Sequence, residues 1–373
     1  MSGTRPSLRR GEGVFSQWKV RQMDFGLYLP CYCPDTSYPA ERLYRDALEQ
    51  AQLAEDLGMG SVSIPEHHFV NYLIHPNPLL TALKVTENTR RLRVMIAVHV
   101  LPFYDMRRLA GEIAQADCLT MGRIEYGVGR GAFRYEFERM SRRLEDSREW
   151  FIDSIKLLEK LLTEEEVSWK SKWYDFPPLT IMPRPYQKPR PPIWIAALAP
   201  EAIASSAKLG YHVMTTPLRD PWKAAKGQVD AFMRAVAEMG ECGRRLRFST
   251  LRMTYVARNE ADKRDKLRLA LENHRRFSNL FDTPGEVRGG AVVPLDHVDL
   301  TEEDMEKALI IGSAQEVLDK MQAFAGLGTH NMQVNSTFGA SHKDVMGALE
   351  RFAAHVMPHF ERHEPRAAAA GAA

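Results

Sequence analysis

The feature that most constrains this chain is a regular alternation between short apolar runs and longer amphipathic segments. Eight runs have the length of a β-strand, and a segment with helical periodicity follows each one. These runs occupy residues 25–30, 61–65, 92–101, 123–128, 192–198, 213–216, 249–257 and 332–335. Strands that alternate with helices form a parallel sheet, so eight such units predict an α/β fold, a (β/α)8 TIM barrel with insertions. An open doubly wound sheet is the alternative, but it more often has a glycine-rich fingerprint after its first strand, and residues 29–33 have none.

The ends and the insertions stand apart from this alternation. Residues 1–22 are basic and weakly periodic, so we expect an N-terminal extension before a barrel domain at 23–362. The alanine-rich residues 363–373 predict a disordered tail. Residues 167–192 are rich in proline and aromatic residues, which favours a hairpin and loop over the barrel mouth, and residues 282–300 form an irregular insertion.

Composition excludes several classes of partner. Hydrophobic residues make up 44% and charged residues 26%, with a net charge of +2, so nothing favours a nucleic acid or an anionic membrane. No apolar run approaches the ~20 residues of a membrane helix, and the N-terminus lacks the apolar stretch of a signal peptide. We therefore expect a cytoplasmic protein. Cys31 and Cys33 have no companions at metal-ligand spacing, so no metal site is expected there.

One stretch, residues 122–140, combines a strand with a turn suited to an anion. The strand runs into Gly129, Arg130 and Gly131. Ligands gather at the carboxyl ends of parallel strands. Two glycines allow close backbone approach, and an arginine supplies a forked donor suited to phosphate. A tight turn with an exposed arginine is the simpler interpretation.

Other strand ends add functional groups to the same predicted face. The second strand ends in Glu66, His67 and His68, and the fifth ends at residues 197–199, directly before a helix. A helix N-terminus attracts anions through its free N–H groups and its dipole, so Arg130 and this helix start are predicted to share a phosphate. Structural hydrogen bonding by the histidines and simple packing of the small residues are the alternatives. Taken together, the strand ends favour a ligand site.

Four stretches resemble a known family in their order and spacing. They are PEHHF at 65–69, IAVHVLP at 96–102, GVGRGAFRYEF at 127–137 with LEDSREW after it, and PPIWIAALAPEAIASSAKLG at 191–210. They are similar to the bacterial luciferase-like flavin-dependent monooxygenases, which are TIM barrels. The resemblance spans about residues 24–360, nearly the whole chain.

The resemblance implies where the cofactor phosphate would lie. Arg130 matches the arginine that holds the FMN phosphate, with the amide of Ala132 beside it. Leu198 and Ala199 match a backbone turn that also contacts the phosphate. Family members often carry a serine where this chain has Ala199, so only the amide is left here.

The resemblance also implies a position for the flavin ring and identifies a catalytic group. Ala97 and Val98 match a strand position against the ring, where the family carries a non-proline cis peptide. His67 matches a histidine implicated in acid/base catalysis. Gly129 stands where luciferase itself has a reactive cysteine, which argues against light emission from a long-chain aldehyde and for another oxygenation.

The implied function is an FMN-dependent monooxygenase that uses FMNH2 and O2 to oxygenate a small organic substrate through a C4a-(hydro)peroxyflavin. No nicotinamide fingerprint is present, so a separate flavin reductase is expected to supply reduced flavin. The family usually forms dimers, which favours a homodimer. Aromatic residues at 169–186, with Phe103, Tyr104 and Phe338, are expected to wall an apolar substrate pocket.

Three other functions remain open from the sequence. A deazaflavin cofactor on the same barrel would give hydride transfer without oxygen. A non-catalytic flavin-binding subunit is less favoured, because His67 and Arg130 are both retained. A metal hydrolase would use Glu66, His67, His68, His75 and His99, but adjacent His67 and His68 would point to opposite faces of a strand.

Overall fold

The computed structural model describes residues 22–218 and 221–361, so nearly all of the predicted extension and the whole predicted tail lie outside it. Eight parallel strands form a closed barrel, because β13 pairs with β1 after the order β1-β2-β3-β4-β7-β8-β9-β13. The strands are β1 Asp24–Tyr28, β2 Ser61–Ile64, β3 Arg93–Val100, β4 Ile124–Gly129, β7 Ile193–Ala196, β8 His212–Thr215, β9 Phe248–Val256 and β13 Asn331–Asn335. The predicted (β/α)8 barrel is confirmed, with each of the eight strands within a few residues of its expected place.

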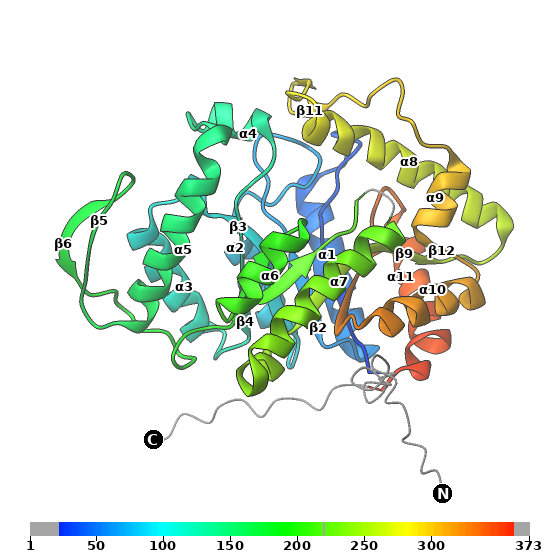
Figure 1. Ribbon diagram of the computed structural model, residues 1–373. Helices are drawn as coiled ribbons and strands as arrows, with labels where there is room; N and C mark the ends of the chain where they lie inside the picture. Colours follow the sequence, from blue (N-terminus) through cyan, green and yellow to red (C-terminus); the bar gives the residue numbers. More distant parts are fainter. Residues whose placement is uncertain (1–21, 219–220, 362–373) are drawn as a thin grey trace, which may run out of the picture.

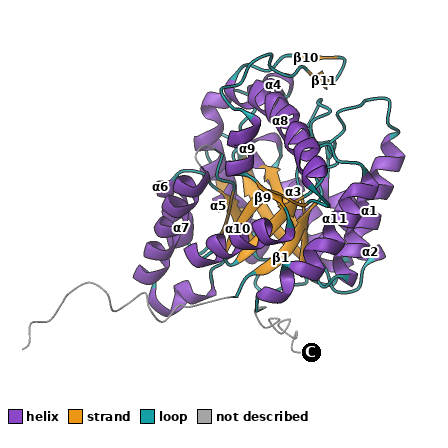
Figure 2. Ribbon diagram, turned by 90° about the vertical axis from the view of Figure 1, so that its right-hand side faces the viewer, coloured by secondary structure: helices purple, strands orange, loops and turns teal. Residues whose placement is uncertain are grey.

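Helices surround the strands on the outside, as Figures 1 and 2 show. The main helices are α1 Ala40–Asp56, α2 Pro78–Asn88, α3 Met106–Leu119, α5 Ser147–Thr163, α6 Pro200–Lys208, α7 Pro221–Glu238, α8 Glu260–Asp282, α10 Ala314–Leu327 and α11 His342–His355. Two shorter helices, α4 Arg134–Arg139 and α9 Glu302–Ala308, lie in connections. Ser313 caps α10 in a capping box. Within the described residues, no helix is both long and apolar enough to span a bilayer.

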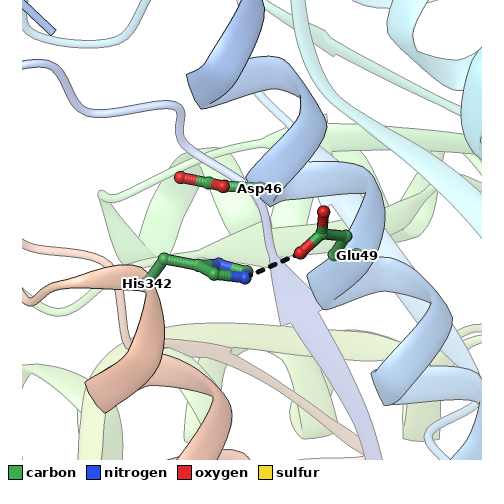
Figure 3. A group of neighbouring side chains, drawn as sticks. All are labelled: Asp46, Glu49 and His342. Atoms are coloured by element: carbon green, nitrogen blue, oxygen red, sulfur yellow. Dashed lines mark hydrogen bonds and ion pairs between the residues drawn. The ribbon is translucent and has the colours of Figure 1, made fainter.

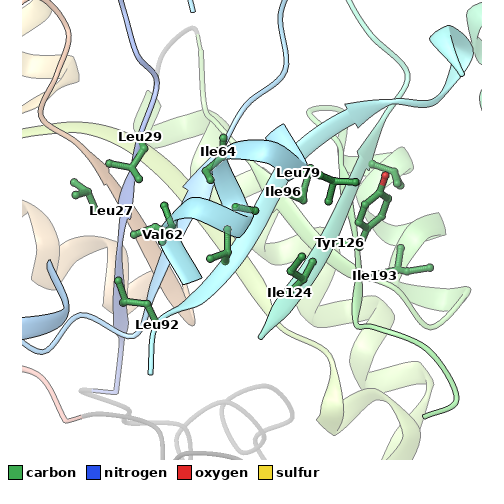
Figure 4. Close-up of a cluster of buried hydrophobic side chains, with 14 of the residues drawn as sticks. Leu27, Leu29, Val62, Ile64, Leu79, Leu92, Ile96, Ile124, Tyr126 and Ile193 are labelled. Atoms are coloured by element: carbon green, nitrogen blue, oxygen red, sulfur yellow. The ribbon is translucent and has the colours of Figure 1, made fainter. Parts of the chain in front are cut away.

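The core lies between the barrel strands and the helices around them. Figure 4 shows Leu27, Val62, Ile64 and Ile96 projecting from neighbouring strands toward this layer. All four are fully buried. Burial of each such side chain contributes roughly 1.5–3 kcal/mol, which explains why the strands read as nearly continuous apolar runs.

Two small elements were not predicted. Strand β12, Ile310–Gly312, extends the sheet by pairing with β9, and its three residues are too few to show a period. Helix α4 begins directly after the turn at Gly131 and is also short. The insertion at 282–300 contains a two-stranded hairpin of β10, Val287–Arg288, and β11, Ala291–Val292.

The aromatic hairpin was placed wrongly. Strands β5, Val167–Lys170, and β6, Asp175–Leu179, do form a hairpin, but it lies at the periphery beside α5 and not over the mouth (Figure 1). Trp173 stacks on Trp150 of α5, with ring centroids 4.4 Å apart and an interplanar angle of 4°. Trp150 Nε1 also donates to the Tyr174 hydroxyl at 3.0 Å. The aromatic residues therefore attach the hairpin to a helix.

Candidate active site

A cavity of about 1140 Å³ opens at the carboxyl ends of the barrel strands. Its walls come from the ends of β2, β3, β4 and β7 and from α5, α6 and α8. Its volume lies slightly above the ~300–1,000 Å³ usual for small-molecule sites. The structure brings every predicted site residue to this one cavity: His67, Ala97, Val98, Arg130, Ala132, Leu198 and Ala199.

The wall formed by β3 and β4 depends on close backbone approach. The Ala97–Val98 peptide is cis, as the resemblance implied, and the pairing of β3 with β4 shifts register between Ile96 and His99. A Cβ on Gly127 would lie 2.0 Å from the Ile96 carbonyl oxygen. The glycine is therefore required by the approach of the two strands, whatever its role in ligand binding.

The His67 ring is held from two sides. Its Nδ1 lies 3.0 Å from Glu136 Oε1, and its ring stacks on Phe133 with centroids 4.7 Å apart. The same Glu136 oxygen accepts the backbone N–H of His68 at 2.7 Å, and Glu136 is only 2% exposed. An ionised carboxylate only accepts, so Nδ1 carries the proton of this bond. Nε2, which has no hydrogen-bond partner within the described residues, is then the nitrogen left for a ligand.

A second acid and histidine pair lies next to the first. His68 Nε2 is 2.6 Å from Glu66 Oε1, and the Val100 N–H donates to Glu66 Oε2 at 3.0 Å. Burial raises the pKa of Glu66. Burial alone would lower the pKa of His68, but the bond to Glu66 and its charge outweigh burial and raise it. The pair therefore retains a proton beside the cavity, which Glu66 lines.

The two remaining candidate histidines are buried and neutral. His99 Nδ1 bonds the Tyr126 hydroxyl, and burial lowers the pKa of His99 to about 3. His75 Nε2 lies 3.0 Å from the Leu29 carbonyl oxygen, and burial lowers its pKa to about 4. The five residues of the hydrolase hypothesis are thus divided among separate hydrogen-bonded pairs.

Within residues 22–218 and 221–361, one group of three possible metal ligands is close enough to share an ion. It consists of Asp46 and Glu49 on α1 and His342 on α11 (Figure 3). None of the three lines the cavity. His342 Nε2 lies 3.0 Å from Glu49, and Asp46 receives the Tyr38 hydroxyl at 2.7 Å and pairs with Arg42 at 3.0 Å. The bond between His342 and Glu49 connects the first barrel helix to the last, whereas the partners of Asp46 are local.

Three cations line the cavity: Arg130, Arg148 and Lys156. None of them has an ion pair or hydrogen bond with another described residue. The start of helix α6 lines the same cavity, and its N-cap, Ala199, makes no side-chain capping bond. The first amides of a helix lack intrahelical partners and lie at the positive end of its dipole. This part of the cavity is suited to a phosphate or another compact anion.

Comparison with known proteins agrees with this geometry. The family model for luciferase-like monooxygenases matches residues 23–331. The chain belongs to the luciferase-like monooxygenase family. It is therefore an oxidoreductase. Over 350 residues it is 29% identical to the oxygenase component of a flavin-dependent trigonelline monooxygenase from Acinetobacter baylyi. The alignment covers 91% of this chain and 96% of that protein.

Solved structures share the barrel of this luciferase-like chain. The monooxygenase RslO1 from Streptomyces bottropensis superposes with a TM-score of 0.77 at 24% identity, covering 90% of this chain and 99% of that one. An F420-dependent secondary alcohol dehydrogenase superposes with a TM-score of 0.71 at 15% identity, covering 91% of this chain and 99% of that one. At these identities the likeness establishes the fold alone.

The predicted aromatic wall was wrong for this family member. No residue of 169–186 lines the cavity among the described residues, and neither do Phe103, Tyr104 or Phe338. Phe338 packs on Tyr255, with centroids 6.3 Å apart. The aromatic residues that line the cavity come instead from strand ends and from helices α5 and α8: Tyr28, Phe133, Phe151, Tyr211, Phe277 and Phe281.

Sequence reasoning also missed three charged residues of the site. Glu136 belongs to the quoted GVGRGAFRYEF stretch, but its bond to His67 spans 69 positions. Arg148 belongs to the quoted LEDSREW stretch, and Lys156 follows it two helical turns later. The detectable signal was their spacing of eight residues, which places both on one face of α5.

Proposed function

We propose that this protein is a flavin-dependent monooxygenase that uses reduced FMN and O2 to oxygenate a small organic substrate. The observation that carries the proposal is one cavity that joins Arg130 and Arg148, the β3–β4 wall and a histidine oriented by a buried carboxylate. The relative from Acinetobacter baylyi, itself a flavin-dependent oxygenase component, supports the same chemistry.

The cavity fits a flavin mononucleotide in its distribution of charge. Arg130, Arg148 and the amides at the start of α6 and at Ala132 would hold the phosphate. The ring would lie against Ala97 and Val98, which line the cavity on the side of β3. When bound, reduced flavin supplies the electrons that activate oxygen.

The residues of the chain would then orient the reactants and move protons. His67 would exchange a proton at Nε2, while Glu136 fixes the tautomer by accepting from Nδ1. The apolar lining would limit the access of water to the reacting groups. Two carboxylates and two histidines lie close together at this end, so proton donors and acceptors are both available.

Phe133, Phe277 and Phe281 line the part of the cavity beside His67 and α8. Phe277 and Phe281 stack with centroids 5.0 Å apart, and Phe133 meets Phe277 edge to face at 6.2 Å. Such surfaces favour a planar, largely apolar substrate. The relative is named an oxygenase component, which supports a separate flavin reductase as partner, and we propose a cytoplasmic homodimer.

The deciding experiment is an anaerobic titration with reduced FMN, followed by an oxygen pulse. Wild-type protein should bind, and Arg130→Ala should weaken binding roughly 10- to 100-fold, as expected for loss of a charged hydrogen bond. Arg134→Ala is the matched control, because Arg134 lies four residues further along the chain, at the start of α4, and pairs with Glu145 at 2.8 Å. Absence of binding by the wild type would overturn the proposal, whereas turnover with a deazaflavin and no oxygen uptake would favour hydride transfer.

A further inference from the structure

The cavity extends beyond the proposed phosphate position, around the end of β7. Trp194 and Ile195 are adjacent in this strand, so their side chains point to opposite faces of the barrel wall. Trp194 packs in the interior with Met95 and Met214, whereas Ile195 packs in the outer layer between strands and helices. Ile195 and Ala196 both line the cavity. The cavity therefore continues from the barrel interior onto its outer side.

This outer part is a groove between α5 and α6, called here the α5–α6 groove. Its two walls have helical spacing. Arg148, Ile152, Ile155, Lys156 and Glu159 line it from α5, and Ala202, Ser205, Ser206 and Leu209 line it from α6 and its C-cap. Between Glu201 in the first turn and Leu209 at the far end, the residues on the α6 side are small, so the middle of the groove stays open.

The far end of the groove is closed by a polar cluster. The Tyr211 hydroxyl donates to Glu159, and Arg190 Nη2 pairs with Glu159 at 2.8 Å. The negative charge of Glu159 is therefore balanced by the positive charge of Arg190. The other acidic residue of the groove is Glu201, in the first turn of α6. A negative charge there stabilises the helix through its dipole.

The unpaired cations exceed the requirement of one phosphate. Arg148 and Lys156 are eight residues apart, which places their Cα atoms about 12 Å apart along α5. Ile152 lies between them and is 45% exposed, so this part of α5 presents an apolar side chain flanked by two cations. Arg130 lines the same continuous cavity as these two residues.

We propose that the α5–α6 groove binds an anionic extension joined to the phosphate of the cofactor, with Lys156 as its charge partner. The inference rests on the proposed function, since it assumes a flavin or deazaflavin phosphate at Arg130. Two cofactors have this chemistry: FAD, through its adenylate, and a deazaflavin whose phosphate carries an oligoglutamate chain. The groove gives either one a larger contact area than FMN has.

The test compares the affinities of full-length protein for FMN, FAD and the oligoglutamyl deazaflavin by fluorescence titration. Lys156→Ala should weaken binding of the extended cofactor roughly 3- to 10-fold and change FMN affinity by less than about twofold, as for a single exposed charge. Lys160→Ala is the matched control, because Lys160 lies one turn further along α5 and pairs with Glu164 at 2.8 Å. Ser205→Phe, which fills the groove from an exposed position, should weaken only the extended cofactor.

The outcomes are separable from those of the proposed function. Tighter binding of FAD or of the deazaflavin than of FMN, lost in both groove variants, supports the inference and identifies the extension. If FMN binds at least as tightly as both extended cofactors, or if Lys156→Ala weakens FMN equally, the inference is wrong while the flavin site stands. If no flavin binds at all, both proposals fail.

Discussion

The Nδ1 atom of His67 lies 3.0 Å from Oε1 of Glu136, a carboxylate that α4 buries directly after the β4 turn. The same oxygen accepts the backbone N–H of His68 at 2.7 Å. One carboxylate oxygen thus fixes both the ring of the candidate catalytic histidine and the chain that carries it. The end of β2 and the end of β4 are joined by this bond, and it determines which imidazole nitrogen faces the cavity.

We expect Glu136→Gln to lower kcat roughly 10- to 100-fold, because an amide can orient His67 but does not stabilise its protonated form. The affinity for reduced FMN should change by less than about twofold, since Glu136 is not among the proposed phosphate partners. Single-turnover and titration experiments measure the two quantities. Glu138→Gln, an exposed change in the same helix, is the control. Equal losses in kcat and in flavin affinity would contradict a positioning role.

Gly127→Ala should destabilise the fold by about 3 kcal/mol, because the new Cβ would lie 2.0 Å from the carbonyl oxygen of Ile96. Backbone atoms cannot move aside as a flexible side chain can, so the β3–β4 pairing must change. Gly111→Ala in α3 is the control: nothing lies within 4 Å of its Cβ position, and it should stabilise by about 0.5–1 kcal/mol. Urea denaturation measures both. If Gly127→Ala leaves the free energy of unfolding unchanged, the two strands are not as close as the structure shows.

These residues also show what sequence reasoning can reach. The strands were predictable because buried parallel strands are locally apolar and because a helix follows each one. The positions of Arg130 and Ala199 followed from strand ends, which topology brings together. The bond between His67 and Glu136 was not predictable, because it depends on how two loops fold over the mouth. The aromatic hairpin was misplaced because Trp and Tyr residues pack on a helix as readily as they line a pocket.

Ala199→Ser should stabilise the protein by about 0.5–2 kcal/mol, because Ala199 is the N-cap of α6, has the extended conformation that caps require, and makes no capping bond. The hydroxyl should also tighten reduced FMN binding about 2- to 10-fold if the phosphate lies at this helix start. Thermal unfolding without flavin and anaerobic titration measure the two effects. Ala202→Ser, within the same helix, should produce neither gain. A more stable variant with unchanged flavin affinity would place the phosphate elsewhere.

The buried His75 predicts how stability depends on pH. Its Nε2 donates to the Leu29 carbonyl at 3.0 Å, its Nδ1 lies 3.2 Å from Thr81 Oγ1, and burial lowers its pKa to about 4. The unfolded chain, with an ordinary histidine pKa of about 6.5, therefore binds more protons than the folded chain between these two values. The stability contributed by the neutral ring is complete above about pH 6.5 and decreases as the pH falls toward about 4.

At about pH 5.5 the folded protein should accordingly have lost about 1.4 kcal/mol through this one ring, relative to about pH 7.5. His75→Gln keeps a neutral donor and acceptor but cannot be protonated, so its stability should decrease by about 1.4 kcal/mol less than that of the wild type over the same interval. His355→Gln, at an exposed position near the end of α11, provides the control. Urea denaturation at the two pH values measures the difference. If wild type and His75→Gln lose the same free energy, His75 is already accessible to protons in the folded state.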